Sequence, residues 1–218
     1  MITITQGENM IKEFCAENYT DLPKAIQAGA KRIELCDNLT VGGTTPSYAV
    51  IEESVKYAHE HDATIMTMIR PRGGNFVYHD IEIKIMETDI LKAIEAGSDG
   101  VVFGCLTETN EIDQEAMETL LIAAEGTQSV FHMAFDAITK QFEAIDWLIA
   151  HGVTRILTHG GPASKTIQEN TEHLKELINY ANNRIEILVG GGVNADNYQS
   201  VVELTGAKQV HGTKIVKF

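Results

Sequence analysis

The sequence predicts an α/β protein of the (β/α)8 TIM barrel class, and two observations lead to that class. Short apolar strands alternate with helical stretches along the whole of the 218-residue chain. In addition, a glycine that ends a helix and is followed at once by an apolar strand recurs at Gly29, Gly97, Gly152 and Gly206, at intervals of 68, 55 and 54 residues. Each interval is about the length of two strand–helix units. Strict alternation favours parallel strands with right-handed crossovers, and the regular repeat favours a closed barrel.

The first half of the chain supplies four of the expected strands. Residues 1–9 are interpreted as a leader or an added extension, and the single domain is expected to span residues 10–218. Alternating apolar residues predict a strand over 11–16, and Thr20 or Asp21 is expected to cap a helix that ends at Gly29. The other expected elements are strands within 30–36, 64–69 and 97–103, and helices over 47–60 and 81–96.

The second half continues the same pattern but does not complete it. Strands are expected within 129–132, 152–158, 186–189 and 206–211, and helices over 113–125, 138–150, 164–181 and 195–204. After the last strand only residues 214–218 remain, which are too few for an eighth helix. The apolar outer wall of the first and last strands therefore needs another cover, and we expect either the short tail or a second subunit of a homo-oligomer to supply it.

The composition excludes several classes of protein. With 31 acidic and 17 basic residues, the formal net charge is -14, which argues against nucleic acid as a partner because phosphate backbones bind basic surfaces. The chain has neither an apolar stretch long enough for a membrane span nor a signal peptide. Its three cysteines are too few for a disulfide framework, so we expect reduced thiols and a cytoplasmic location.

Strand parity separates the side chains that face the helices from those that face the barrel interior. The residues expected to face the helices are Phe14, Ile33, Leu35, Ile65, Ile69, Phe131, Leu157, Val189 and Val210. The residues expected to face the interior are Glu13, Cys15, Glu34, Cys36, Met66, Met68, Arg70, His132, Thr158 and His211. Because buried charges need compensation, carboxylates, thiols and histidines on the inner side predict a functional site at the carboxyl ends of the strands.

Two chemistries compete for this site. Cys15 and Cys36, on adjacent strands at matching heights, form a pair of soft ligands that suits Cu(I) and, with more difficulty, Zn(II). The alternative is an enzyme in which Glu13, Glu34 and His132 act as acid and base groups on a small phosphorylated or carboxylated metabolite. Asp136, in the second case, either orients His132 or caps the following helix.

Several residues are candidates for holding an anion. Arg70 and Arg72 follow the third strand in an Arg-Pro-Arg-Gly-Gly loop, where they either fork onto a carboxylate or phosphate or pair with the protein's own carboxylates and brace the loop. The run Gly190-Gly191-Gly192 is expected to open a helix, so amides at Gly191 and Gly192 are candidate phosphate ligands. Thr158 and His211, at the ends of the sixth and eighth strands, complete this set.

The sequence resembles the CutC copper homeostasis family from residue 10 onwards. The resemblance is carried by Arg-Ile-Glu-Leu-Cys at 32–36, Gly-Gly-Thr-Thr-Pro-Ser at 42–47, Arg-Pro-Arg-Gly-Gly at 70–74, His-Met-Ala-Phe-Asp at 132–136, Leu-Thr at 157–158 and Val-His at 210–211. It implies a cytoplasmic, often oligomeric TIM barrel associated with copper, in which Cys15 and Cys36 form the copper site. It also implies a strand-end cluster of Glu13, Cys15, Glu34, Cys36, Arg70, Arg72, His132, Asp136, Thr158 and His211.

The chain departs from the family pattern at three places. Met133 stands where the family usually has an arginine, and His159 follows Thr158 where a serine usually precedes the glycines. The extended tail of longer members is also missing. The resemblance therefore implies one cation fewer at the site and an additional possible ligand in His159.

Overall fold

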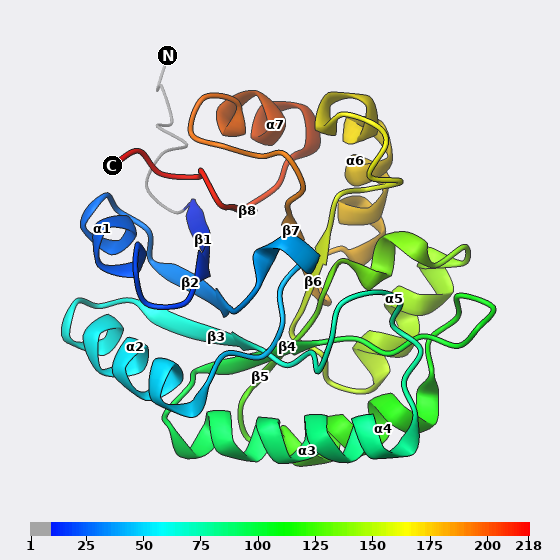
Figure 1. Ribbon diagram of the computed structural model, residues 1–218. Helices are drawn as coiled ribbons and strands as arrows, with labels where there is room; N and C mark the ends of the chain where they lie inside the picture. Colours follow the sequence, from blue (N-terminus) through cyan, green and yellow to red (C-terminus); the bar gives the residue numbers. More distant parts are fainter. Residues whose placement is uncertain (1–9) are drawn as a thin grey trace.

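The computed structural model describes residues 10–218 and shows a closed barrel of eight parallel strands in the order β1-β2-β3-β4-β5-β6-β7-β8 (Figure 1). The predicted TIM barrel is thus confirmed. The segment 1–9, expected to be a leader, lies outside the described residues. The strands are β1 (Ile11–Glu17), β2 (Arg32–Cys36), β3 (Thr64–Met68), β4 (Gly100–Phe103), β5 (Gln128–Phe131), β6 (Arg155–Thr158), β7 (Glu186–Val189) and β8 (Gln209–Gly212).

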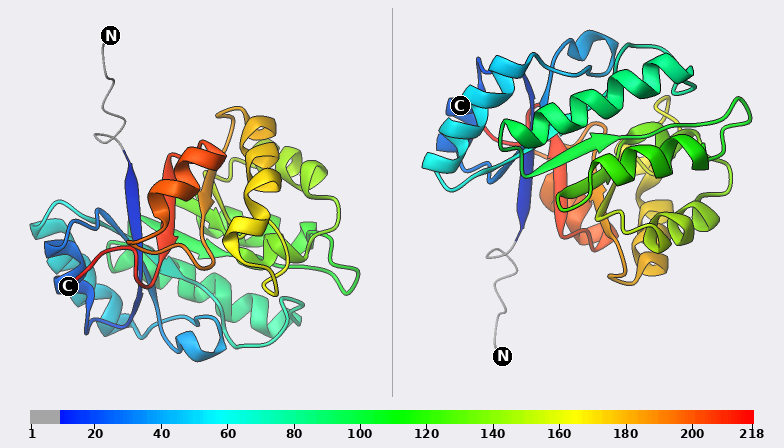
Figure 2. Two further views of the ribbon diagram at one scale, coloured as in Figure 1. Left: turned by 90° about the horizontal axis from the view of Figure 1, so that it is seen from above. Right: turned by 90° about the horizontal axis from the view of Figure 1, so that it is seen from below.

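The helices surround the strands (Figure 1), and the views from above and below show the same arrangement (Figure 2). They are α1 (Leu22–Gln27), α2 (Tyr48–Glu60), α3 (Asp80–Glu95), α4 (Gln114–Ala123), α5 (Gln141–Ala150), α6 (Thr171–Ala181) and α7 (Tyr198–Thr205). Three short 3-10 helices lie in loops after β2, β5 and β6: η1 (Leu39–Val41), η2 (Met133–Ala137) and η3 (Ile167–Asn170). The helices expected from 138, 164 and 195 therefore begin later, and η2 and η3 precede two of them.

The tail after β8 takes the place of the eighth helix. Ile215 and Val216 are buried in the main hydrophobic core, and Lys214 pairs with Asn194 in a parallel bridge. The ring of Phe218 contacts that of Phe14 on β1 edge-on, with 5.7 Å between centroids. In Figure 1 the tail crosses the gap between α7 and α1. The chain thus covers part of the wall that the missing helix leaves.

Two hydrophobic clusters fill the molecule, one between the strands and the helices and a smaller one inside the barrel. The inner cluster consists of Cys15, Cys36, Met66, Met68, Val102, Val130, Leu157 and Leu188, with Leu39 and Met133 packed against it. Met66 uses space that Gly100 leaves free, since a Cβ atom on Gly100 would lie 2.1 Å from the Met66 methyl group. The barrel is therefore a packed core at its middle and not a pore.

The inner cluster corrects one assignment made from strand parity. Leu157 was expected to face the helices, but it packs inside the barrel with Leu188. Successive side chains of a strand point to opposite faces, so the neighbouring Thr158 faces away from the interior. The assignment was wrong because the middle of this barrel is apolar as well, and an apolar residue can lie on either face of the strand.

Candidate functional site

Two of the three cysteines lie together at the carboxyl ends of β1 and β2. Strand register pairs Cys15 with Glu34, and Cys36 follows two residues later on the same side of β2. Both thiols contact one carboxylate oxygen: Sγ of Cys15 lies 3.4 Å, and Sγ of Cys36 3.6 Å, from Oε2 of Glu34. The ligand atoms of the three residues all lie within 4.8 Å of one another, a spacing that could hold a metal ion.

A second group of possible ligands shares Glu34 with the first. His211 on β8 places Nδ1 2.8 Å from Oε1 of Glu13 and Nε2 3.6 Å from Oε2 of Glu34. These three residues are buried, and their ligand atoms also lie within 4.8 Å of one another. His211, expected to bind an anion, thus lies between the carboxyl groups of Glu13 and Glu34, and these occupy both of its ring nitrogens.

Arg32, which the sequence analysis did not select, forms a buried ion pair with Glu13. Burial alone would raise the pKa of Glu13, but the charge of Arg32 and the contact with His211 lower it to about 2. Arg32 also donates to Gln209, and Arg155 donates to both Gln209 and Glu186. These polar residues form the floor of the barrel below the thiols. Arg32, Glu34 and Cys36 are alternate residues of β2 and therefore face the same side. This alternation is the sequence signal that could have identified Arg32 as a residue of the barrel interior.

The protonation of the thiol group follows from its neighbours. The hydrogen bond with Cys36 and the proximity of His211 lower the pKa of Cys15 well below its usual value, against the effect of burial. The pKa of Cys36 is raised by its contact with Cys15 and by burial, and burial raises the pKa of Glu34. Burial would lower the pKa of His211, but Glu34, Cys15 and Glu13 raise it. Cys15 therefore carries the thiolate character and His211 the positive charge.

Arg70 is buried in the loop after β3, apart from this cluster. Its Nη1 donates to the carbonyl oxygens of Val41 (2.8 Å) and Gly43 (3.0 Å), and its Nη2 donates to that of Gly74 (2.8 Å). Its Nε has no partner within residues 10–218. The loop carbonyls therefore fix the guanidinium group and leave one donor free.

Arg72 has a different role from Arg70. Its side chain is 37% exposed and forms an ion pair with Glu82, with Nε 2.5 Å from Oε1. The remaining donors bind Asn75 and the carbonyl oxygens of Gly73 and Val77. Of the two alternatives, the contacts favour the one in which Arg72 braces the loop.

His132 directly follows β5 and is a buried, neutral donor. Its Nδ1 accepts a hydrogen bond from the backbone N–H of Ala134 at 3.3 Å, so the ring hydrogen lies on Nε2. Burial and, to a smaller extent, the charge of Arg70 lower the pKa of His132 to about 3. Nε2 is buried and has no partner in the described part of the chain. A general base needs a free lone pair, which this tautomer does not present at Nε2.

Asp136 takes neither of its two expected roles, because it binds the loop after β6. Its carboxylate accepts hydrogen bonds from the hydroxyl of Thr158 (2.5 Å) and from the backbone N–H groups of His159 (2.9 Å) and Gly160 (3.2 Å). It therefore neither orients His132 nor caps α5, which begins at Gln141. The sequence placed Asp136 and Thr158 in the barrel site, whereas the structure places them together in a loop contact outside it.

The glycines after β7 do not open a helix. Gly191 and Gly192 have φ angles of +75° and +91°, but α7 begins only at Tyr198, with Asn197 as its N-cap. The carbonyl of Gly192 accepts a hydrogen bond from the Asn197 side chain at 2.9 Å. A Cβ atom on Gly191 would lie 2.3 Å from Nδ1 of His159, so this glycine makes room for that ring. His159 is itself packed against the carbonyls of Gly190 and Lys165 and lies outside the two groups of possible metal ligands.

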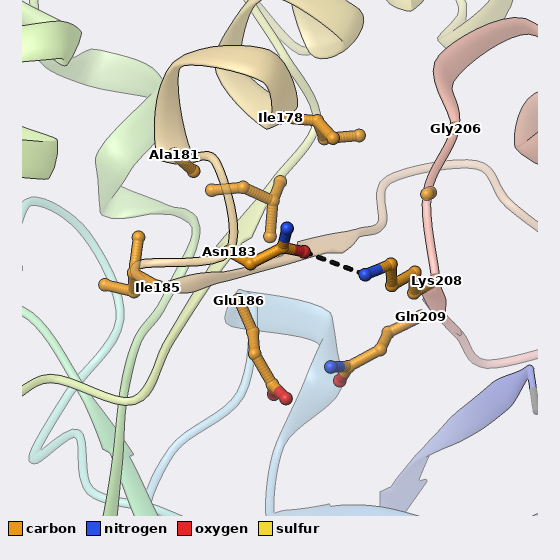
Figure 3. A pocket seen from close by; sticks show the side chains of 10 residues that line it. Ile178, Ala181, Asn183, Ile185, Glu186, Gly206, Lys208 and Gln209 are labelled. Atoms are coloured by element: carbon orange, nitrogen blue, oxygen red, sulfur yellow. Dashed lines mark hydrogen bonds between the residues drawn. The ribbon is translucent and has the colours of Figure 1, made fainter.

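A cavity of about 170 Å³ lies at the other end of the barrel (Figure 3). It is lined by Glu186 and Gln209, the first residues of β7 and β8, and by Asn183 and Lys208, which share a hydrogen bond of 2.8 Å. The amino ends of barrel strands usually serve stability, and catalytic groups gather at the carboxyl ends. We therefore place the candidate site at the thiols and not in this cavity.

Comparison with known proteins agrees on one family. The family model described as the CutC family matches residues 10–216. A CutC family protein of Enterococcus faecalis is 62% identical over 95% of this chain and 100% of its own length. The copper homeostasis protein cutC homolog of Mus musculus is 38% identical over 94% of this chain and 74% of its own length.

Solved structures give the same result. The crystal structure described as the putative copper homeostasis protein CutC from Streptococcus agalactiae is 57% identical, with a TM-score of 0.93 over 95% of this chain and 100% of that one. Deoxyribose phosphate aldolase from Aeropyrum pernix has a TM-score of 0.69 at 11% identity, over 95% of this chain and 86% of its own, and shares the fold alone.

Proposed function

Because this chain belongs to the CutC family, we propose that it takes part in copper homeostasis by binding Cu(I) between Cys15 and Cys36. The observation that supports the proposal is the contact of both thiols with the same oxygen of Glu34. It places two soft donors side by side at the carboxyl end of the barrel. Thiolates are preferred ligands of Cu(I), and the reducing cytoplasm, where we propose that the protein acts, keeps thiols free for it.

The surroundings of the thiols fit a singly charged soft ion. Cys15 has a lowered pKa, so it offers a thiolate at little cost, and Cys36 must release its proton when the metal binds. Oε2 of Glu34 contacts both thiols, and burial raises the pKa of this carboxyl group, which favours its neutral form beside the Cys15 thiolate. The carboxylate of Glu13, a hard ligand, is occupied by its ion pair with Arg32 and does not compete with the thiols for the ion.

None of the helices described over residues 10–218 is long and apolar enough to cross a membrane. Three free cysteines are buried in the structure. Cys105 lies in the core outside the barrel, and burial raises its pKa, so it is an inert thiol and a suitable control.

An anaerobic titration with a competing Cu(I) chelator tests the proposal. We expect the wild type to withdraw one Cu(I) per chain, Cys105→Ser to behave identically, and the double variant Cys15→Ser plus Cys36→Ser to lose binding. If the double variant keeps the wild-type stoichiometry and affinity, the site lies elsewhere. If the wild type itself fails to compete, direct copper binding is wrong.

A further inference from the structure

Arg70 is a buried cation without a carboxylate partner. Only 4% of its surface is exposed, and within residues 10–218 it takes part in no ion pair. Its hydrogen bonds go to three backbone carbonyls, which offset only part of the cost of burying a charge. In contrast, Arg32, Arg72, Arg155 and Arg184 each pair with a carboxylate. In a chain with 31 acidic residues, a purely structural arginine would have such partners available.

His132 provides a second unpaired donor near Arg70. The hydrogen bond from Ala134 occupies Nδ1 and leaves the N–H group on Nε2, where it is buried without a partner in the described residues. A buried donor without an acceptor is costly, and such groups in folded proteins call for an explanation. Nε of Arg70 is likewise a buried donor without an acceptor among the described residues.

Phe76 connects the two donors. Its ring centroid lies 4.9 Å from Cζ of Arg70 and 4.8 Å from the ring centroid of His132. A cationic and a neutral side chain thus lie against one aromatic ring, each with an N–H group that has no acceptor within hydrogen-bond distance among residues 10–218. Because the loop carbonyls hold both Nη atoms of Arg70, the guanidinium group is already oriented before any ligand arrives.

We propose that Arg70 and His132 bind the carboxylate group of a small organic monoanion beside Phe76. The Nε–H of Arg70 supplies a charge-assisted hydrogen bond, and the Nε2–H of His132 supplies a neutral one. One cation balances one negative charge, which favours a carboxylate over a phosphate dianion. The other predicted anion ligands support that choice, since Arg72 is occupied by Glu82 and the glycines after β7 do not form a helix N-terminus.

The site is distinct from the thiol pair. Its residues come from the loop after β3 and the end of β5, whereas Cys15 and Cys36 lie on β1 and β2. The segment 41–43 lies between the two, because the carbonyl of Gly43 accepts from Arg70 and a Cβ atom on Gly43 would lie 3.1 Å from Sγ of Cys36. The carboxylate site therefore does not depend on copper binding.

The test is an NMR titration of the wild-type protein with pyruvate and lactate, following the ¹⁵N signal of His132 Nε2. We expect a saturable shift of that signal with at least one of the two carboxylates and a weaker effect with inorganic phosphate. Arg70→Met should weaken binding at least tenfold, the usual effect of losing a charged hydrogen bond. Arg184→Met is the matched control and should bind within about twofold of the wild type, since Arg184 forms a surface ion pair with Asp146 and takes no part in the loop after β3.

A second pair of variants separates a binding role from a structural one. His132→Gln keeps an N–H donor and should retain binding, whereas His132→Leu removes it and should lose binding, as measured by calorimetry with the same carboxylates. This pair also decides the matter if Arg70→Met does not fold. The proposal is wrong if neither carboxylate shifts the wild-type signal, or if His132→Leu binds as well as His132→Gln. Cys15→Ser plus Cys36→Ser should bind the carboxylate normally, so failure of the copper proposal leaves this result unchanged.

Discussion

The thiol of Cys15 lies 3.4 Å from Oε2 of Glu34, its partner in the register between β1 and β2. The contact exists because residues paired across parallel strands point to the same side of the sheet. Two register steps towards the floor, Glu13 is opposite Arg32 in the same way. The layer of Cys15 and Glu34 therefore lies directly above the charged layer of Glu13 and Arg32. The charges of the lower layer must be paired for the barrel to be stable.

We predict that Arg32→Met destabilises the protein by about 3–5 kcal/mol, because it removes the ion-pair partner of the buried carboxylate of Glu13. The measurement is the free energy of unfolding in urea at pH 7. Adding Glu13→Gln should restore a large part of the loss, since the double variant no longer buries the carboxylate that Arg32 paired with. If the single and double variants are equally unstable, loss of packing and not the unpaired charge is the cause.

Asp136 gives a second prediction, which separates a structural from a catalytic role. Asp136→Ala removes the acceptor of two backbone N–H groups and of the Thr158 hydroxyl, so we expect a loss of about 2–3 kcal/mol in unfolding free energy. Asp136→Asn keeps one oxygen and should lose about half as much. Binding of Cu(I) by either folded variant should match the wild type, and a large change in that binding would contradict the structural role.

Much of the fold could be predicted from the sequence because its signals are local. Helix-ending glycines and period-two strands mark each unit, and strand parity placed Glu13, Glu34 and the two cysteines on one side. The assignment of Leu157 from strand parity was wrong because the middle of the barrel interior is apolar too. At that height, an apolar residue can face either the helices or the interior.

The contacts made by Arg72, Asp136 and Gly191 could not be predicted from the sequence, for a different reason. They lie in loops beyond the strand ends, where neither parity nor helical periodicity applies. Their partners are also distant in sequence or are backbone groups: Asp136 binds a loop more than twenty residues away, and Arg72 binds carbonyls that no sequence pattern marks.

A third prediction concerns the tail that replaces the eighth helix. Ile215 is completely buried, so Ile215→Ala should cost about 2–5 kcal/mol in unfolding free energy, measured in urea. Phe218 is 58% exposed, and Phe218→Ala should cost about 1 kcal/mol or less despite its contact with Phe14. Equal effects of the two changes would show that the tail does not pack as described.

The same tail bears on self-association. A homo-oligomer was expected because the wall of β1 and β8 lacked a cover, and Ile215 and Val216 now cover part of it. Self-association stays a prediction, which sedimentation of the wild type at micromolar concentration tests directly. A monomer of 24.0 kDa would show that the tail covers the wall of β1 and β8 without a second subunit.

The last prediction is a pH dependence caused by His132. Its folded pKa is about 3 against an ordinary value of 6.5, so between these values the unfolded chain binds a proton that the folded chain does not. The stability that this neutral imidazole contributes is complete above pH 6.5 and falls by about 1.4 kcal/mol per pH unit below it. His211 has a raised pKa and the opposite sign, so the quantity to measure is the difference in unfolding free energy between wild type and His132→Gln from pH 7 to 5. We expect the wild type to lose about 2 kcal/mol more than the variant over that range. Parallel curves would mean that His132 takes up a proton in the folded protein, which would remove the neutral donor from the proposed carboxylate site.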